Sequence, residues 1–452
     1  MKEKEDKLLK EKPFKLMLEL SVPAIIGMVV IGLYPLMDGI FAGQILGQQA
    51  MTAVGIAMPM TYINSGISTL IGVGSASILS RAMGRKDQQT IDKIMSNLLF
   101  WVVLLSAIVT VLGLIFTDQL LSIMGATPDI QALAVRYMKI IFIGSLFVNF
   151  TQASNMVLRG EGLMKDAMII MGTGALINIV LDPIFMRAMG DSGIEGAAIA
   201  TVIAQVIQAL MTIYYFKNKN KTVKIKGVKA DKAIYNEMFG VGVSAMLFQV
   251  LSILQQTLLY NFAFANGGES AGSIMAASLR VFSFSFIPLW GMSQGLQPAI
   301  GANFGAKNYD RVKEIFKVFA INATILAATF WIPSLIFTGK LLGLFGLEGQ
   351  VLIQGIPGFR IFYSAFITYG IMIMCITFFQ AVGDGKSAGL LVMLRQIILF
   401  VPAVFILPKS LGLTGVWLAE PIPDFIVFLI GLWKYKKTIR DFYQAWKRER
   451  RR

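Results

Sequence analysis

Four acidic residues lie inside long apolar stretches of the sequence, where a charge is costly. Asp38 occurs in LYPLMDGIFAG and Asp182 in ALINIVLDPIFM, while Glu420 and Asp424 both occur in VWLAEPIPDF. Placing an ionised side chain at the centre of a bilayer costs roughly 3 kcal/mol or more. An acid in such a position is therefore a candidate for ion or proton binding, and each of the four is a candidate here.

The first two acids have polar or helix-breaking neighbours at informative spacings. Asn178 lies four residues before Asp182, and Tyr34 lies four residues before Asp38, so each pair shares one helix face. Pro183 follows Asp182 and would free a backbone carbonyl for an ion or a water molecule. Two carboxyl groups in apolar surroundings could share a proton or hold Na⁺. The alternative is that each acid is a static group with a fixed partner.

The second pair of acids is harder to interpret. Pro421 and Pro423 interrupt the helix that carries Glu420 and Asp424, and this break could expose both acids to solvent. The sequence assigns no role to either acid.

Other polar residues inside apolar stretches could line a cavity. Three arginines lie inside spans, namely Arg280, Arg360 and Arg395. Each would either extend its charged end to the membrane surface or pair with a buried acid. An arginine that instead lined a cavity would repel a cationic substrate. Gln255 and Gln256 are adjacent, so at most one of them points into any cavity.

The composition requires a membrane around these residues. Of 452 residues, 56% are hydrophobic and only 15% are charged, against about 25% charged in soluble domains. Apolar runs of about 20 residues can cross a bilayer as helices. The sequence predicts an all-α integral membrane protein with twelve such spans, at residues 15–42, 51–80, 93–117, 134–158, 166–188, 195–217, 236–265, 272–304, 313–338, 352–380, 387–407 and 412–433.

The twelve spans form two copies of one pattern. LIFTDQLLSIMG begins at Leu114 and LIFTGKLLGLFG at Leu335, an offset of 221 residues that also relates SRAMGRKD to GANFGAKN. The copies differ at the acids. Leu259 corresponds to Asp38 at this offset. Near the end of each half the offset becomes 219, as GIEG at Gly193 and GLTG at Gly412 show, and Thr201 then corresponds to Glu420. The Thr201 hydroxyl could bind an ion or only pack against another helix. We expect four segments, namely a six-helix bundle at 1–217, a cytoplasmic linker at 218–235, a second bundle at 236–434 and a basic tail at 435–452.

The distribution of positive charge predicts the topology. The net charge is +15, and the lysines and arginines gather in alternate loops, which places those loops, the linker and both termini in the cytoplasm. An even number of spans per half gives both halves the same orientation, so the repeats are parallel. The charged start, MKEKEDKLLKEKPFK, does not resemble a cleaved signal peptide. The basic linker is interpreted as a solvated connector rather than a lipid-binding patch.

Several function classes are excluded by residue type. The chain has no histidine and one cysteine, Cys375, so an internal disulfide or thiolate metal site is not expected and proton chemistry must use carboxylates. It has no phosphate-binding glycine loop, HExxH motif or nucleophile–base pair. We therefore expect neither an enzyme nor a cofactor other than H⁺ or Na⁺. Because the positive charge lies in short loops and tails, nucleic-acid binding is not expected.

Two known families share a twelve-span, two-half plan. The loop motif of the major facilitator superfamily matches poorly, because SRAMGRK has serine in place of the acid and an extra residue before glycine. The chain instead resembles the multidrug and toxic compound extrusion (MATE) family over essentially its full length. The matching segments, in order, are MDGIFAG, GVGSASILSRAMGRKD, LRGEGLMKDA, INIVLDPIF, QPAIGANFGAKN and GLTGVWLAEPIPD.

The MATE resemblance implies a fold, a function and a site. It implies two six-helix bundles facing a central cleft, and drug export driven by inward flow of H⁺ or Na⁺. Similarity to the prokaryotic DinF-like branch implies an ion or proton site in the first half, at Asp38, Asn178 and Asp182, with Tyr34, Asn155 and Thr201 nearby. Another branch uses acids in the seventh and tenth spans, where this chain has only Gln255 and Gln256 in the seventh.

The sequence is compatible with three functions. The leading hypothesis is a monomeric antiporter of bulky, amphipathic organic cations in the cell membrane, coupled to H⁺ or Na⁺. A flippase for a lipid-linked precursor is the second. Arg280 and Arg360 favour it and the acids of the first half oppose it. A receptor or scaffold is the third, but it needs neither the duplication nor the buried acids.

Overall fold

All regular secondary structure in the described part of the chain is helical. The computed structural model describes residues 7–124 and 126–451, except for the side chains of residues 34–36, 445 and 449–451. In these residues there are ten helices long and apolar enough to cross a membrane, and the bent pair α5 (Pro128–Ile143) and α6 (Ser145–Gly160) adds an eleventh. The 74-residue α9 (Lys232–Gly305) is two helices joined at Gly268, which adds the twelfth. The predicted all-α membrane fold is confirmed.

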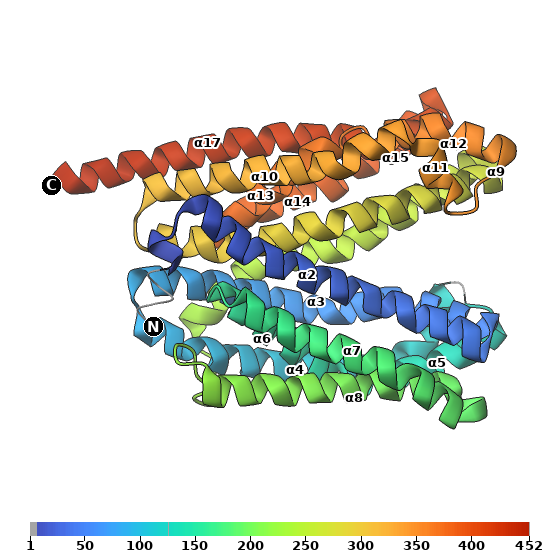
Figure 1. The fold of residues 1–452 in the computed structure, drawn as a ribbon, viewed down its shortest axis with the longest axis horizontal. Coiled ribbons are helices and arrows are strands. Elements are labelled where there is room, and N and C mark those ends of the chain that lie inside the picture. Colours follow the sequence, from blue (N-terminus) through green and yellow to red (C-terminus); the bar gives the residue numbers. More distant parts are fainter. Residues whose placement is uncertain (1–6, 125, 452) are drawn as a thin grey trace. The chain divides into compact units, whose positions relative to one another are not determined.

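The helices group into two compact units (Figure 1). Among the described residues, unit 1 comprises residues 26–242 and unit 2 comprises residues 7–25 and 243–451. The division falls inside α2 (Pro13–Phe41) and α9, whereas the sequence prediction assigned the whole first span to the first bundle. The remaining helices of unit 1 are α3 (Gln48–Arg85), α4 (Gln88–Ile123), α7 (Met164–Ala188) and α8 (Gly193–Tyr214), together with α5 and α6.

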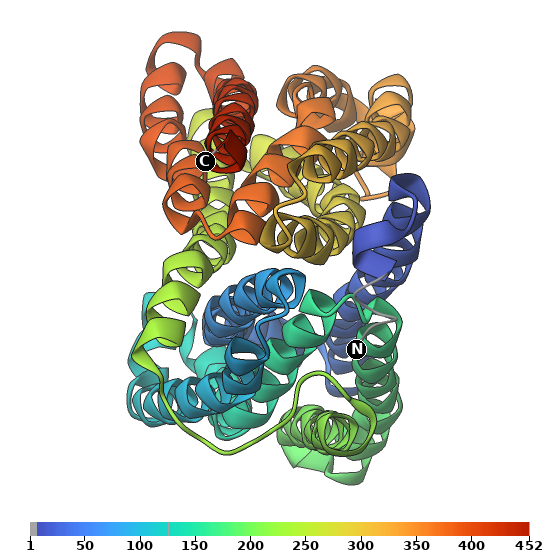
Figure 2. The same ribbon diagram turned by 90° about the vertical axis from the view of Figure 1, so that its left-hand side faces the viewer.

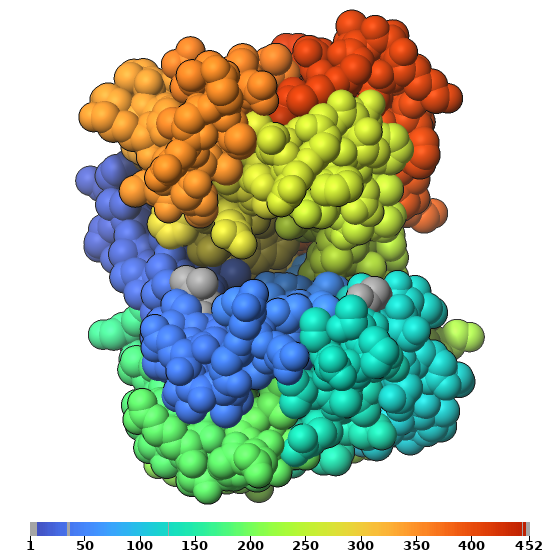
Figure 3. Space-filling model, turned by 90° about the vertical axis from the view of Figure 1, so that its right-hand side faces the viewer, coloured from blue at the N-terminus to red at the C-terminus, as the bar shows by residue number. Residues whose placement is uncertain are grey.

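Unit 2 repeats this plan with more breaks in its helices. Its remaining elements are α10 (Tyr309–Ile336), α11 (Thr338–Gly343), α12 (Gly349–Phe362), α13 (Phe366–Val382), α14 (Gly385–Met393), η4 (Leu394–Ile398), α15 (Phe400–Leu411), α16 (Leu413–Leu418) and α17 (Pro421–Arg451). Figure 3 shows the end of unit 2 at which α11 and α12 lie, in orange.

The outward faces of the helices carry large apolar side chains. Leu176, Val180 and Ile184 follow one another at four-residue spacing on α7 and are each more than half exposed. Such a stripe is costly in water and favourable in lipid. Cys375, on α13, is fully buried.

The internal repeat extends to an irregular detail of the backbone. Lys86 and Lys307 are the two described non-glycine residues with positive φ, at 60° and 56°. They are separated by the same 221 residues that relate the sequence repeats. Lys86 ends α3 in the left-handed conformation, and its N–H bonds back to the Met83 carbonyl. Both halves therefore turn in the same way between their second and third spans.

Glycines allow α3 and the start of α9 to touch backbone to backbone in unit 1. A Cβ atom at Gly242 would collide with the Leu70 carbonyl oxygen, and one at Gly74 would collide with the Met238 carbonyl oxygen. Small residues permit this close approach, which is typical of helix contacts in membranes. The two contacts are reciprocal, because each helix contributes one glycine and one carbonyl.

Gly242→Ala is expected to destabilise the protein by about 1–3 kcal/mol, because the added methyl group meets backbone rather than a flexible side chain. Thermal unfolding in detergent would measure the effect. Gly240→Ala, on the same helix, is the matched control, because a Cβ there has no atom within 4 Å. Equal melting temperatures for the two variants would contradict the close approach.

The predicted linker, residues 218–235, belongs to unit 1 and packs on its helices rather than lying free in solvent. It crosses the end of unit 1 (Figure 2), and its backbone N–H at Lys229 bonds to the Ser96 carbonyl. The Asp231 N–H donates to the Asn97 side chain at 2.7 Å, and Lys93 pairs with the Asp231 carboxylate at 2.8 Å. Val223 is fully buried. The linker is thus more ordered than the predicted solvated connector.

Asp231→Asn is expected to loosen the linker and to speed its cleavage by trypsin. The hydrogen bond from Lys93 lowers the pKa of Asp231 below its usual value, so this contact stabilises docking above about pH 4 and is lost as the pH falls through the lowered pKa. Cleavage after the linker lysines would be followed at neutral pH. Asp191→Asn, at an exposed acid, is the control, and equal cleavage rates would argue against the contact.

Candidate functional site

Four helices of unit 1 bring a polar cluster into its apolar interior. Asp182 and Asn178 lie on α7, Thr201 on α8, Asp38 on α2 and Tyr137 on α5. The Asn178 amide donates to Asp182 Oδ1 at 2.9 Å and lies 3.1 Å from Thr201 Oγ1. The Tyr137 hydroxyl donates to Asp38 Oδ2 at 3.1 Å. All five side chains are buried, so the cluster is screened from bulk water.

Oxygen atoms in this cluster outnumber the donors that face them. Asp38 Oδ1, Asn178 Oδ1 and Asp182 Oδ2 are buried and accept no hydrogen bond from the described side chains. Asp38 and Asp182 lie close enough for their charges to interact, and no arginine or lysine pairs with either acid among the described residues. Because buried carboxylates are normally paired with a cation, this arrangement suits a proton or a small monovalent cation.

The local sequence of α7 explains how its two residues reach the cluster. Asn178 and Asp182 are four residues apart and therefore face the same way. Pro183 has no N–H, so the carbonyl of Ile179 lacks its usual helical donor. The helix packs along α8, and the absence of a side chain at Gly174 makes room for Gln208 of α8.

The other residues predicted in unit 1 have different positions. The side chain of Tyr34 lies outside the described residues. Asn155 is buried, but both ends of its amide are used: it donates to the Ala167 carbonyl at 2.8 Å and accepts from Arg159 at 2.9 Å. Asn155 therefore joins α6 to α7, and no contact with the acids is found among the described atoms.

The predicted polar residues of unit 2 divide between interior and surface. Gln255 is buried, whereas Gln256 is exposed. This agrees with the expectation that adjacent residues of a helix point in different directions. Arg280 and Arg360 are exposed, and Arg360 donates to the Leu335 carbonyl at 3.1 Å. Of the five unit 2 residues considered for a cavity, only Gln255 and Arg395 are buried.

Glu420 and Asp424 form a second buried cluster around Arg395. Arg395 Nη2 lies 2.9 Å from Glu420 Oε1, and its Nε lies 2.7 Å from Asp424 Oδ1. Its Nη1 donates to Gln255 Oε1 at 2.9 Å, and its guanidinium carbon lies 4.8 Å from the centre of the Tyr369 ring. The prolines do not expose these acids, because both are at most 4% exposed. Of the alternatives considered for the arginines inside spans, pairing with a buried acid is the one found for Arg395.

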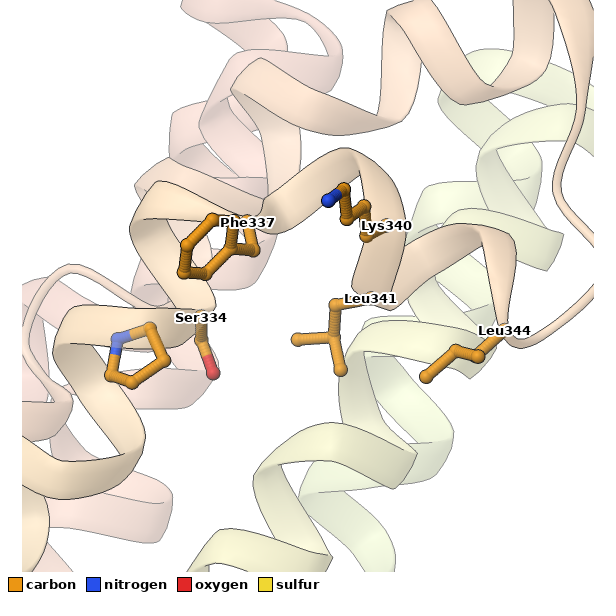
Figure 4. Close-up of a pocket in the computed structure, with 6 residues that line it drawn as sticks. Ser334, Phe337, Lys340, Leu341 and Leu344 are labelled. Atoms are coloured by element: carbon orange, nitrogen blue, oxygen red, sulfur yellow. The ribbon is translucent and has the colours of Figure 1, made fainter.

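A shallow pocket of unit 2 lies apart from this second cluster. It is lined by Pro333, Ser334, Phe337, Lys340, Leu341 and Leu344, with a volume of about 260 Å³ (Figure 4). Lys340 lies over the Phe337 ring at 5.7 Å. The lining is mainly apolar and contains no acid, so it offers none of the chemistry of the two clusters.

Sequence reasoning missed Tyr137 as a partner of Asp38. The two residues are 99 positions apart, so no local spacing connects them. The only available signal is that a tyrosine with a buried hydroxyl needs a hydrogen-bond partner, and that signal does not identify which one.

Comparison with known proteins agrees with the duplicated fold. The MatE family model matches the chain twice, at residues 23–184 and 245–406. The multidrug export protein MepA of Staphylococcus aureus (strain MRSA252) is 28% identical over 409 residues, which is 90% of each chain. MepA of Staphylococcus haemolyticus is 28% identical and covers 92% of this chain and 93% of its own.

Solved structures show the same arrangement of helices. An outward-facing multidrug resistance MATE family transporter is 26% identical, covers 97% of this chain and 98% of its own, and superposes with a TM-score of 0.89. A MOP superfamily transporter from Pyrococcus furiosus, whose binding pocket is described as having reversed polarity, has a TM-score of 0.88 at 26% identity, covering 97% of this chain and 98% of its own.

The matched ranges span well over half of the chain, and the second begins at residue 245, almost the same distance from the first as the repeats. The chain therefore belongs to the MatE family of membrane transporters, and it is not an enzyme.

Proposed function

We propose that this protein exports bulky, amphipathic organic cations in exchange for H⁺ or Na⁺. The relatives named as multidrug exporters support the export of several compounds. One observation supports the coupling to an ion, namely the three buried oxygens of Asp38, Asn178 and Asp182 that accept no hydrogen bond from described side chains. A cation or proton would satisfy them, and no arginine or lysine of the described residues pairs with these acids instead.

The proposed cycle uses the charge of the first cluster. The ion or proton binds at Asp38 and Asp182 and neutralises them, with Asn178 and Thr201 holding the geometry of α7 against α8. A cationic drug and the bound ion then stabilise different states of the protein. Exchange follows because each ligand can shift the equilibrium only by its differential affinity for those states.

We place the working protein as a monomer in the cell membrane, with both termini in the cytoplasm. This orientation rests on the alternation of positive loops. A flippase for lipid-linked precursors is less well supported, because Arg395, the buried arginine of unit 2, is already paired with Glu420 and Asp424 and is not free to hold a phosphate.

Efflux from proteoliposomes would test the coupling. The purified protein is reconstituted, a fluorescent organic cation is enclosed, and a pH gradient and a Na⁺ gradient are applied separately. We expect one of the two gradients to drive the cation against its own gradient. Equal flux with and without both gradients would contradict ion coupling, and high-affinity binding of a lipid pyrophosphate instead of the cation would favour the flippase.

A further inference from the structure

The charges of the buried cluster in unit 2 do not balance. The cluster contains one guanidinium, on Arg395, and two carboxyl groups, on Glu420 and Asp424. All three are at most 4% exposed. If both acids were ionised, the cluster would carry one net negative charge in a low-dielectric interior, which is costly. One further positive charge is therefore needed to make the cluster neutral.

The contacts of the two acids show where that charge can reside. Asp424 lies against Arg395 through both of its oxygens, at 2.7 Å from Nε and 3.5 Å from Nη2. Glu420 uses only Oε1, and its Oε2 is buried and accepts no hydrogen bond from the described residues. The main chain holds the acids together, because the Asp424 N–H donates to the Glu420 carbonyl at 3.1 Å.

The other groups around the cluster do not supply the charge. Gln255 of α9 presents an unpaired Nε2, which is a donor and cannot bind a cation. Tyr369 of α13 faces the guanidinium with its ring. Cys375 of α13 lies near Gly431, further along α17 than Asp424. A metal ion would need several free oxygens, whereas a proton needs one.

The helix geometry around the cluster is also unusual. Arg395 lies in η4, a π-helical turn between α14 and α15, and Glu420 lies at the break between α16 and α17, beside Pro421. Short π-helical turns and broken helices in membrane proteins occur frequently at functional sites. These irregularities place the arginine and the acids in direct contact.

We propose that Glu420 and Asp424 share one bound proton beside Arg395, so that unit 2 contains a proton-binding site separate from the acids of unit 1. The proton adds to a carboxylate oxygen, with Glu420 Oε2 as the resting position, and no other bond is formed or broken. The cluster is then neutral as a whole. This site does not depend on the proposed function, because it is a property of the folded protein without substrate.

Infrared spectroscopy of the full-length protein tests the proposal, since a protonated carboxyl group has a C=O band that a carboxylate lacks. The parent for the measurement carries Asp38→Asn and Asp182→Asn, which removes the two acids of the buried cluster in unit 1. At neutral pH we expect this band in the parent. In both Glu420→Gln and Asp424→Asn its intensity should fall by the equivalent of one carboxylic acid. Either substitution leaves one acid opposite one arginine, a neutral pair that needs no proton.

The exposed acid Glu348 provides the matched control, because Glu348→Gln should leave the band unchanged. Circular dichroism and gel filtration confirm that each variant is folded. If only one of the two unit 2 variants folds, its loss of the band is sufficient support. Absence of the band in the parent, or its persistence in a folded Glu420→Gln or Asp424→Asn variant, would overturn the proposal.

Discussion

Asp182→Asn is expected to reduce ion-driven drug export to the level of vesicles that contain no protein. Asparagine has nearly the same shape and can still accept the hydrogen bond from Asn178, which is 2.9 Å long in the wild type. It cannot carry a negative charge, so the cluster loses its ability to bind and release a cation or proton. The measurement is gradient-driven efflux of a fluorescent cation from proteoliposomes.

The comparison for this result is Asp191→Asn, which removes an exposed acid near the start of α8 and should leave export intact. Passive exchange of substrate could persist in Asp182→Asn, because the cluster is proposed to drive transport and not to form the path for the drug. Wild-type export by a correctly inserted Asp182→Asn protein would mean that this cluster is a static structural feature.

Arg395→Met is expected to destabilise the folded protein by about 3–5 kcal/mol. Removing one partner from a buried ionic cluster leaves the other charges without compensation. Here two carboxyl groups, on Glu420 and Asp424, would face each other with no cation between them. Thermal or denaturant unfolding in detergent would measure the loss.

Two further variants test whether the loss of stability comes from the buried charges. Arg280→Met removes an exposed arginine and should change stability by no more than about 0.5 kcal/mol. A triple variant, Arg395→Met with Glu420→Gln and Asp424→Asn, removes every charge and should recover much of the loss, since neutral replacements of buried ion pairs are often tolerated. Similar melting temperatures for Arg395→Met and Arg280→Met would show that the cluster contributes little to the stability of the folded protein.

Local patterns in the sequence account for much of the fold. The twelve apolar runs correspond to helices because a helix satisfies its own backbone in lipid. The repeat could be recognised because its loop motifs are copied, and the structure shows the copy in the matching backbone of Lys86 and Lys307. The pairing of Asn178 with Asp182 also follows from their four-residue spacing.

Contacts between distant residues could not be predicted in the same way. The bond from Tyr137 to Asp38 joins α5 to α2, and the pairing of Arg395 with Glu420 depends on the helix breaks that lie between them in the chain. The charge imbalance around Arg395 becomes visible only once these three side chains are known to touch. The docking of the linker likewise depends on Asn97 of α4, which no pattern in the linker itself indicates.

The complete burial of Cys375 has a practical consequence for measuring motion. Thiol reagents need access to sulfur. The Cys375 side chain, on α13, is fully buried and lies beside Gly431 of α17. A spin label or fluorophore could then be attached at an introduced surface cysteine without first removing the native one. Distances between pairs of such labels would report how each unit rearranges while substrate and ion exchange.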